Sequence, residues 1–359
     1  MVTMIVLAVG GPFVLGVLAT MLVRSRALRR GFVDRPGGHK QHGEPVALGG
    51  GIAVFAAVVL PLLAAVLVAV VFARNGSPAW VPELMCRYRD GITEKLPVLL
   101  SILGGGLVLH VVGLVDDFRP LGPAVKFSAQ FAVAFAVVLG LDLRLLTVLP
   151  TVASVGLTVL WIVLITNAFN FLDNMDGLAA GVAAIAAVIF AAAALLAGQL
   201  FVPLLALILA GALLGFLPFN FAPARIFMGD AGSMVVGYLL AVLTILTTFY
   251  DPDRGLQPFG VLVPVVVLAV PLYDVASVCW HRLRAGDSVF RGDRRHFSHR
   301  LTRRGMSVPT AVLTIYLATA TTAMSALILP RSDWPMACVV FAQCICVVLI
   351  IAILEHVRD

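Results

Sequence analysis

Three groups of acidic and amide side chains lie where long apolar stretches of this chain end. The first is the pair Asp116-Asp117, the second lies between Asn167 and Gly177, and the third is the run from Gly229 to Ser233. A charge near a bilayer is costly unless it faces protein or water, so a membrane protein keeps one mainly where it is used. The three groups therefore predict metal and phosphate chemistry in a membrane-embedded enzyme.

The neighbouring carboxylates of Asp116 and Asp117 repel each other in the segment Gly113-Leu-Val-Asp-Asp-Phe-Arg-Pro120. Such a pair persists most easily if a divalent cation or a shared proton relieves the repulsion. Mg²⁺ is the natural partner, because it prefers oxygen ligands and commonly accompanies phosphate. A solvated turn at a helix end is the alternative for an Asp-Asp pair considered alone.

The second group steps by three residues through Asn167, Asn170, Asp173 and Asp176. In an α-helix each member lies about 60° back from the one before it, so neighbours share one drifting stripe. Carboxamides and carboxylates together supply donors and acceptors, which suits a nucleoside and a diphosphate. Asn and Asp are also ordinary cap and turn residues, but the regular spacing favours a functional role.

In the third group, Asp230 lies between Gly229 and Gly232, just before a long apolar helix. Glycine lets a backbone approach a ligand closely, and the start of a helix presents free N–H groups to an anion. A carboxylate at this place can hold a metal that screens a phosphate. Considered alone, the same run is also a common helix N-cap sequence.

Basic side chains occur in two other polar segments. Lys40 and His42 lie in the first, and Arg295, His296, His299 and Arg300 lie in the second. The two histidines of the second segment are three residues apart and would share a helix face, which predicts a phosphate-binding surface. A basic cytoplasmic loop is expected in any membrane protein, however. A zinc site is disfavoured, because the pair has no third ligand at a familiar spacing.

The elements that must position these groups are membrane helices. The chain has 359 residues, of which 61% are hydrophobic and 12% charged, whereas soluble domains carry about 25% charged residues. Apolar stretches long enough for a bilayer, which needs roughly 20 helical residues, predict an all-α polytopic integral membrane protein with about eleven transmembrane helices. The predicted spans are 3–23, 49–72, 97–115, 127–142, 150–166, 178–197, 201–218, 233–250, 260–280, 309–329 and 336–354.

The distribution of basic residues predicts the orientation of these spans. No basic residue precedes the first span and four arginines closely follow it, which is the reverse of a cleavable signal peptide. We therefore expect the N-terminus outside and the C-terminus in the cytoplasm. In this topology the cytoplasmic loops and tail hold 18 of the 25 Lys and Arg residues, and all three acidic groups lie on the cytoplasmic face.

The same topology accounts for most of the net charge of +6, together with attraction for anionic lipid and phosphate. Nucleic-acid binding is not needed to explain it. Without a repeat or a long polar linker, residues 1–359 are expected to form a single transmembrane domain. The five cysteines indicate neither a disulfide framework nor a cysteine-based metal site. The predicted active-site loops are 24–48, 116–126, 167–177, 219–232 and 281–308.

Taken together, these segments resemble the polyprenyl-phosphate N-acetylhexosamine-1-phosphate transferase family (glycosyltransferase family 4). The motifs match in order from Asp34-Arg-Pro36 to Leu301, including Lys126-Phe-Ser-Ala-Gln130 and Pro271-Leu-Tyr-Asp274. The likeness is closer to the WecA/TagO type than to the MraY type, because the loop reads His296-Phe-Ser-His299 and an eleventh span follows. Two positions depart from the family pattern: Asn174 replaces a usual Gly, and Ser298 replaces a frequent His.

The resemblance implies a bacterial inner-membrane enzyme with a cytoplasmic active site. It would transfer N-acetylhexosamine 1-phosphate, most simply GlcNAc 1-phosphate, from a UDP-sugar to polyprenyl phosphate such as undecaprenyl phosphate, and release UMP. This is the first membrane step of cell-wall or surface-polysaccharide synthesis, lipopolysaccharide included. The implied partners are the two substrates and the lipid bilayer, and homodimerisation is left open.

The resemblance also implies roles for individual residues. Asp230 and Asp117 would bind Mg²⁺, for which Mn²⁺ could substitute, and Asp116 would orient or deprotonate the lipid phosphate. Phe227 would stack on uracil. The remaining substrate contacts would come from Lys40, His42, Lys126, Asn167, Asn170, Asp173, Asp176, Arg295, His296, His299 and Arg300.

Three other functions are compatible with parts of the pattern. A phospho-MurNAc-pentapeptide transferase of the MraY type is the nearest. An ion-coupled transporter would have similar hydropathy, but its ion site is expected near the bilayer midplane, whereas the acidic groups here share one face. An intramembrane aromatic prenyltransferase also pairs Asp motifs with Mg²⁺, but it would not need the Asn/Asp series or the His-Arg loop.

Overall fold

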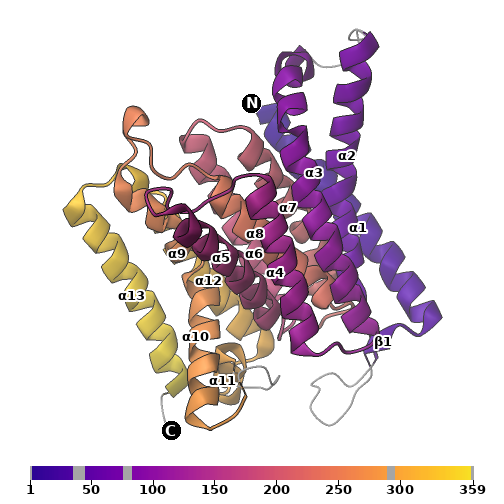
Figure 1. Cartoon of the computed structure of the whole chain (residues 1–359). Helices are drawn as coiled ribbons and strands as arrows, with labels where there is room; N and C mark the ends of the chain where they lie inside the picture. Colours follow the sequence, from indigo (N-terminus) through magenta and orange to yellow (C-terminus); the bar gives the residue numbers. More distant parts are fainter. Residues whose placement is uncertain (1, 35–44, 76–82, 289–295, 357–359) are drawn as a thin grey trace.

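The computed structural model describes residues 2–34, 45–75, 83–288 and 296–356. Within these described ranges the regular structure is helical except for a hairpin of two short strands, and Figure 1 shows the helices packed side by side in one bundle. The first seven helices are α1 (Val2–Arg30), α2 (Gly50–Asn75), α3 (Glu83–Phe118), α4 (Pro123–Gly140), α5 (Thr151–Leu172), α6 (Leu178–Leu196) and α7 (Phe201–Asn220).

The second half of the bundle is less regular than the first. Three short 3-10 turns occur here, η1 (Pro252–Arg254), η2 (Pro258–Leu262) and η3 (Leu329–Arg331). The α-helices are α8 (Asp230–Leu246), α9 (Val263–Val267), α10 (Ala269–Arg284), α11 (Phe297–Arg303), α12 (Val308–Ala326) and α13 (Trp334–His356). Figure 1 shows that α13 ends at the end of the bundle opposite to the start of α1.

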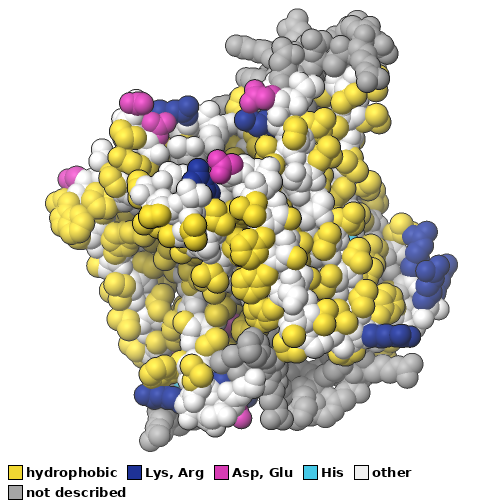
Figure 2. Space-filling model, viewed as in Figure 1, with side chains coloured by type: hydrophobic (Ala, Val, Ile, Leu, Met, Phe, Trp, Pro, Cys, Tyr) yellow, Lys and Arg dark blue, Asp and Glu magenta, His cyan; other side chains and the backbone are white. Residues whose placement is uncertain are grey.

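The helices confirm a polytopic membrane protein. Nine helices in the described residues are long and apolar enough to cross a membrane, and a bent pair makes up to ten. Figure 2 shows apolar side chains over the middle of the visible face and most of its charged side chains toward the two ends. This distribution fits a molecule whose middle contacts lipid. The orientation predicted from the arginines stays a prediction.

Two of the eleven predicted spans differ from straight transmembrane helices. The stretch predicted as 233–250 forms α8, which has only 17 residues and ends at Leu246. The stretch predicted as 260–280 is bent by 63° between the segment Pro258–Val267 and α10. Pro271 explains the bend, because it has no N–H and its ring clashes with the carbonyl oxygen of Val267, four residues earlier.

Helix α8 lies at the centre of the bundle. Every residue from Ala231 to Thr244 is buried, and α8 packs against α2, α3 and α5. Small residues allow this, since membrane helices associate through close backbone packing and not through the hydrophobic effect. At Gly237, for example, a Cβ atom would lie 2.8 Å from the Ile165 carbonyl oxygen of α5. The neighbours of α8 therefore hold its first residue, Asp230, in place.

A small hairpin joins the N-terminal segment to the loop before α8. Strand β1 (Val33–Asp34) pairs antiparallel with β2 (Val46–Ala47), and Ala47 also bridges in parallel to Ile226. The Phe227 N–H donates to the Ala47 carbonyl oxygen over 2.9 Å. The predicted loops 24–48 and 219–232 therefore contact each other, although residues 35–44 between the strands lie outside the described residues.

Candidate active site

Four helix ends bring their polar side chains to one place. Asp116 and Asp117 lie in the last turn of α3, Lys126 in the first turn of α4, Asn170 near the end of α5, and Asp230 at the start of α8. We call these five residues the carboxylate cluster. The Lys126 ammonium lies 3.2 Å from Asp116 Oδ2 and 2.7 Å from Asp230 Oδ2, so it joins two carboxylates that are far apart in the sequence.

Asp117 caps the N-terminus of α8. Its Oδ1 accepts from the Asp230 N–H over 2.8 Å, and its Oδ2 accepts from the Ala231 N–H over 3.2 Å. A carboxylate is favoured at this position, since it satisfies unpaired N–H groups and faces the positive end of the helix dipole. Asp117 thus fixes the start of α8 while its two oxygens keep further lone pairs for a cation.

Glycines allow the close approach of these helices. Gly229 has φ +72° and ψ 178°, and a Cβ atom there would lie 2.6 Å from Asp117 Oδ2. A Cβ atom at Gly113 of α3 would lie 2.5 Å from the Ala231 nitrogen, and one at Gly51 of α2 would lie 2.3 Å from the Gly232 nitrogen. The start of α8 is therefore in backbone contact with two other helices.

The two asparagines of the predicted series have different partners. The Asn170 Nδ2 donates to Asp230 Oδ1 over 2.9 Å and to Ser233 Oγ over 3.0 Å. Asn167 instead donates from Nδ2 to Gln130 Oε1 on α4 over 2.5 Å. Asn170 therefore orients Asp230, whereas Asn167 joins α4 to α5 and its hydrogen bonds within the described residues are to Gln130 and Val163.

The two aspartates of the series follow α5. Burial raises the pKa of Asp173 well above its usual range, and the negative charges of Asp230 and Asp117 raise it further, against a hydrogen bond from the Gly229 backbone. Asp173 therefore lies close to the carboxylate cluster. The Asp176 side chain contacts a different segment, because its Oδ2 accepts from the Ala224 N–H over 2.9 Å. Asp176 connects this turn to the loop between α7 and α8.

His296 is held by a buried carboxylate. It is the N-cap residue of α11, and its Nδ1 lies 2.7 Å from Oδ2 of Asp274, which is fully buried on α10. The Phe297 N–H donates to the other oxygen of Asp274 over 3.1 Å. The His296 ring meets Phe171 of α5 edge-on, with 5.8 Å between the ring centroids, and lies 6.4 Å from the His299 ring. Both histidines are thus near the end of α5.

Arg300, a predicted phosphate contact, forms an ion pair within the protein. Its Nη2 lies 2.8 Å from Oε2 of Glu355 on α13 and donates to Ser277 Oγ over 2.9 Å. The Tyr273 hydroxyl donates to the other Glu355 oxygen over 2.6 Å. Glu355 is buried, so this ion pair fixes α11 to α10 and α13. The structure shows no contact between Arg300 and the carboxylate cluster among the described residues.

The two departures from the family pattern contact each other. The Ser298 hydroxyl donates to Asn174 Oδ1 over 2.6 Å, and Asn174 Nδ2 donates to the Phe171 carbonyl oxygen over 2.7 Å. The guanidinium of Arg282 also lies over the Phe171 ring, 5.4 Å from its centroid. These contacts join the basic segment after α10 to the turn between α5 and α6.

The remaining predicted residues lie at the edge of the site or outside the described residues. Phe227 is partly exposed, three residues before Asp230, and its carbonyl oxygen accepts from the Gly50 N–H over 2.9 Å. Nothing can be said of the structure around Lys40, His42 and Arg295, because the described residues do not include them.

Several residues that support the site were not among the predicted site residues. Asn220 is buried and accepts from the Gly177 N–H over 3.2 Å, while its Nδ2 donates to the Ile226 carbonyl oxygen over 3.0 Å. Gln130 and Asp274 lie in motifs that the sequence analysis quotes, which is the signal that could have identified them. Asn220 and Glu355 carry no comparable signal, because neither lies in a quoted motif and Gly177, Tyr273 and Arg300 are distant from them in the sequence.

The oxygen-rich cluster suits a hard cation. Within the described residues, no three acidic, histidine or cysteine side chains form a group able to hold a metal ion by themselves. The cluster nevertheless combines three carboxyl groups with one ammonium group, which contacts Asp116 and Asp230, while Asp117 accepts from backbone N–H groups. Mg²⁺ usually takes one or two protein carboxylates and completes its shell with water and phosphate oxygens. The donor set therefore fits Mg²⁺ bound together with a phosphate substrate.

A comparison with protein families gives one match. Residues 99–248 match the family model described as "Glycosyl transferase family 4". The matched segment runs from the second half of α3 to just beyond α8. It therefore includes the whole carboxylate cluster and the turn after α5, but not the α11 segment.

Relatives whose names state an activity are similar to most of the chain. A Bacillus subtilis protein, "Probable undecaprenyl-phosphate N-acetylglucosaminyl 1-phosphate transferase", is 33% identical over 321 residues, which cover 87% of this chain and 81% of the relative. The Mycobacterium tuberculosis "Decaprenyl-phosphate N-acetylglucosaminephosphotransferase" is 35% identical, with 83% and 76% covered. A Yersinia pestis "Undecaprenyl-phosphate alpha-N-acetylglucosaminyl 1-phosphate transferase" is 26% identical, with 90% and 85% covered.

Proposed function

Because this chain belongs to glycosyl transferase family 4, we propose that it transfers N-acetylglucosamine 1-phosphate from UDP-GlcNAc to polyprenyl phosphate and releases UMP. The observation that carries the proposal is the carboxylate cluster, in which four helix ends surround Lys126 inside the segment that matches the family. The names of the relatives favour N-acetylglucosamine over a MurNAc-pentapeptide as the transferred group. The product would be a polyprenyl diphosphate sugar for envelope glycan synthesis.

Phosphoryl transfer depends mainly on positioning and on neutralising charge. Asp230 and Asp117 would hold Mg²⁺, which when bound supplies positive charge to the diphosphate. Lys126 already lies between Asp116 and Asp230, so its ammonium is in place to contact a phosphate oxygen of either substrate. Asn170 keeps Asp230 oriented through its hydrogen bond to Oδ1.

The acceptor needs orientation more than deprotonation. A phosphate monoester has a second pKa near 6, so at neutral pH the lipid phosphate is largely ionised and nucleophilic. Asp116 would orient this phosphate through Lys126, which it contacts over 3.2 Å. The bond from the acceptor oxygen to the sugar-linked phosphorus forms as the bond to UMP breaks.

The nucleotide would extend from the cluster toward the turn after α5. Asp173 lies next to the cluster, and Asp176 and Asn220 fix the turn. Phe227 of the neighbouring loop would then stack on the uracil. His296 and His299 would bind the diphosphate, with Asp274 holding the His296 ring. Arg300 would act as a positioning residue, because its guanidinium is bound to Glu355. Lys40, His42 and Arg295 are proposed as further phosphate contacts.

The test supplies the purified full chain with radiolabelled UDP-GlcNAc, undecaprenyl phosphate and Mg²⁺. We expect labelled lipid from the wild type and a loss of about a hundredfold or more in Asp230→Asn, the size expected for a group that stabilises transition-state charge. Asp253→Asn is the matched control, since Asp253 is an exposed carboxylate in the η1 turn. Full activity in Asp230→Asn would refute the role of Asp230, and no labelled lipid from the wild type would refute the proposed reaction.

A further inference from the structure

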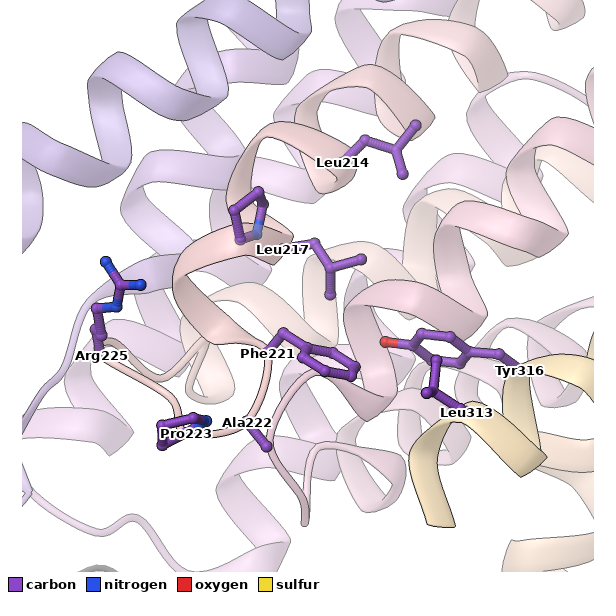
Figure 3. Close-up of a pocket in the computed structure, with 9 residues that line it drawn as sticks. Leu214, Leu217, Phe221, Ala222, Pro223, Arg225, Leu313 and Tyr316 are labelled. Atoms are coloured by element: carbon purple, nitrogen blue, oxygen red, sulfur yellow. The ribbon is translucent and has the colours of Figure 1, made fainter. Parts of the chain in front are cut away.

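A groove lies on the outside of the bundle between the end of α7 and α12. It encloses about 540 Å³, which is within the roughly 300–1,000 Å³ typical of small-molecule sites. We call it the α7–α12 groove and define it by Leu214, Leu217, Phe221, Arg225, Leu313 and Tyr316. Figure 3 shows Arg225 on one side, Leu313 and Tyr316 on the other, and Leu217 and Phe221 between them.

The groove has a cationic end and an apolar end. Leu214 and Leu217 lie within the α7 span, and Leu313, 55% exposed, lies within the α12 span. Arg225 follows α7, where the chain has left the span, and its side chain is exposed. The groove therefore changes from aliphatic to cationic along the direction in which a membrane changes from hydrocarbon to headgroup.

An arginine of α1 contacts the backbone at the cationic end of the groove. The Arg24 Nε donates to the Arg225 carbonyl oxygen over 3.3 Å. Among the described residues, neither guanidinium forms an ion pair with a carboxylate. At the groove, an anionic group would therefore find the positive charge of Arg225, which no carboxylate of the described residues neutralises.

The groove is connected to the turn after α5 but not to the carboxylate cluster. The Tyr316 hydroxyl donates to the Gly177 carbonyl oxygen over 2.5 Å. Among the described residues, no groove residue forms a hydrogen bond or ion pair with the cluster. A lipid phosphate at Arg225 would thus contact a residue that forms no hydrogen bond or ion pair with the cluster among the described residues.

We propose that the α7–α12 groove binds an anionic phospholipid as a non-reacting ligand. Its phosphate would contact Arg225, and one acyl chain would lie along Leu217, Leu214 and Leu313. This pairs each part of the ligand with a part of the groove of matching polarity. A basic residue near an anionic membrane surface contributes about 1 kcal/mol, which corresponds to about fivefold in affinity.

The test measures retained lipid on the full-length protein by native mass spectrometry. The delipidated protein in detergent receives equal amounts of phosphatidylglycerol and phosphatidylcholine. We expect the wild type to retain phosphatidylglycerol about fivefold over phosphatidylcholine, and Arg225→Gln to lose that preference. Arg304→Gln, which removes an exposed arginine outside the groove, should keep it.

A second pair of variants tests the apolar part. Leu313→Trp should fill the groove and lower retention of both lipids, whereas Leu317→Trp, one turn further along α12 and 69% exposed, should not. Both positions tolerate a larger side chain because they are exposed, and thermal unfolding checks that both variants fold. None of these measurements uses sugar transfer, so they are independent of the proposed function.

Three results would overturn the proposal. The first is wild-type retention in both Arg225→Gln and Leu313→Trp. The second is one-for-one displacement of phosphatidylglycerol by undecaprenyl phosphate, which would make the groove an acceptor site. The third is conversion of a dimer to a monomer by Leu313→Trp without a change in bound lipid, which would make the groove an interface between two copies of the chain.

Discussion

Lys126 has an unusual set of neighbours for a residue at a helix start. Its ammonium contacts Asp116 and Asp230, and 23% of its side chain is exposed. A partly dehydrated ammonium between two carboxylates interacts more strongly than a surface pair would. A cation that takes oxygens from Asp230 would therefore leave the Lys126 charge available to a phosphate.

At Gly229, substitution should disturb both backbone and site. Its φ and ψ lie in a region that is essentially restricted to glycine, and a Cβ atom would clash with Asp117. We expect Gly229→Ala to lose about 3 kcal/mol or more of unfolding free energy, measured by denaturant titration in micelles. The matched control is Gly255→Ala, with φ +71° but no atom within 4 Å of a Cβ, which should lose about 1 kcal/mol. Equal losses of unfolding free energy in the two variants would show that the contact with Asp117 does not contribute to the stability of the fold.

The hydrogen bond between Asn174 and Ser298 can be measured by a double-mutant cycle. If it holds the α11 segment against the turn after α5, Asn174→Ala and Ser298→Ala should each lower kcat/KM for UDP-GlcNAc. The double variant should lose less than the sum of the two, by about 0.5–3 kcal/mol of coupling. Additive losses would mean that the hydrogen bond does not position the segment.

The sequence indicates some residues of the site more clearly than others. Asp116, Asp117 and Asp230 stand out because each lies in a short polar run at the end of an apolar segment. Asn167 and Arg300 stand out equally, yet their partners are Gln130 and Glu355, which are 37 and 55 residues away. Residue type and local spacing say nothing about partners at such separations, so the role of each residue depends on the tertiary packing.

At the scale of elements, α13 takes part in the arrangement of the basic segment. Its residue Glu355 accepts from Arg300 of α11 and from Tyr273 of α10. Breaking a buried ion pair by removing one partner typically costs about 3–5 kcal/mol, because the other charge stays buried and unpaired.

The buried pair predicts an order of stabilities. Glu355→Gln should lower the free energy of unfolding by about 3 kcal/mol, and Arg300→Gln combined with Glu355→Gln should lower it by less. Thermal unfolding in detergent, followed by circular dichroism, measures both. A double variant that is less stable than the single one would show that the pair is not the main contact of Glu355.

The sequence predicts the apolar helices well, but it does not predict the position of each helix in the bundle or where a helix is bent. The hydropathy of α8 resembles that of its neighbours, so its central and fully buried position could not be predicted from apolar residues alone. The bend before α10 has a visible cause in Pro271. Prolines also occur inside straight spans, at Pro12 of α1 and Pro61 of α2, so the residue type alone does not identify the bend.

At the scale of the whole molecule, the predicted topology remains to be tested. The excess of Lys and Arg in alternate loops predicts that the N-terminus lies outside and the carboxylate cluster on the cytoplasmic face. Cysteine introduced at Thr3 should react with a membrane-impermeant maleimide in intact cells, and one introduced at exposed Arg304 should react only after lysis. The reverse labelling pattern would show that the N-terminus lies in the cytoplasm and that the carboxylate cluster lies on the outer face.

The length of α8 has a consequence for where the two substrates meet. A helix of 17 residues rises about 25 Å, less than the roughly 30 Å of a hydrocarbon core, and Asp230 is its first residue. We therefore expect Asp230 to lie at or just inside the boundary of the hydrocarbon core and not in bulk water. The polyprenyl phosphate acceptor would then react while it stays in its leaflet. The water-soluble nucleotide would bind at the membrane surface.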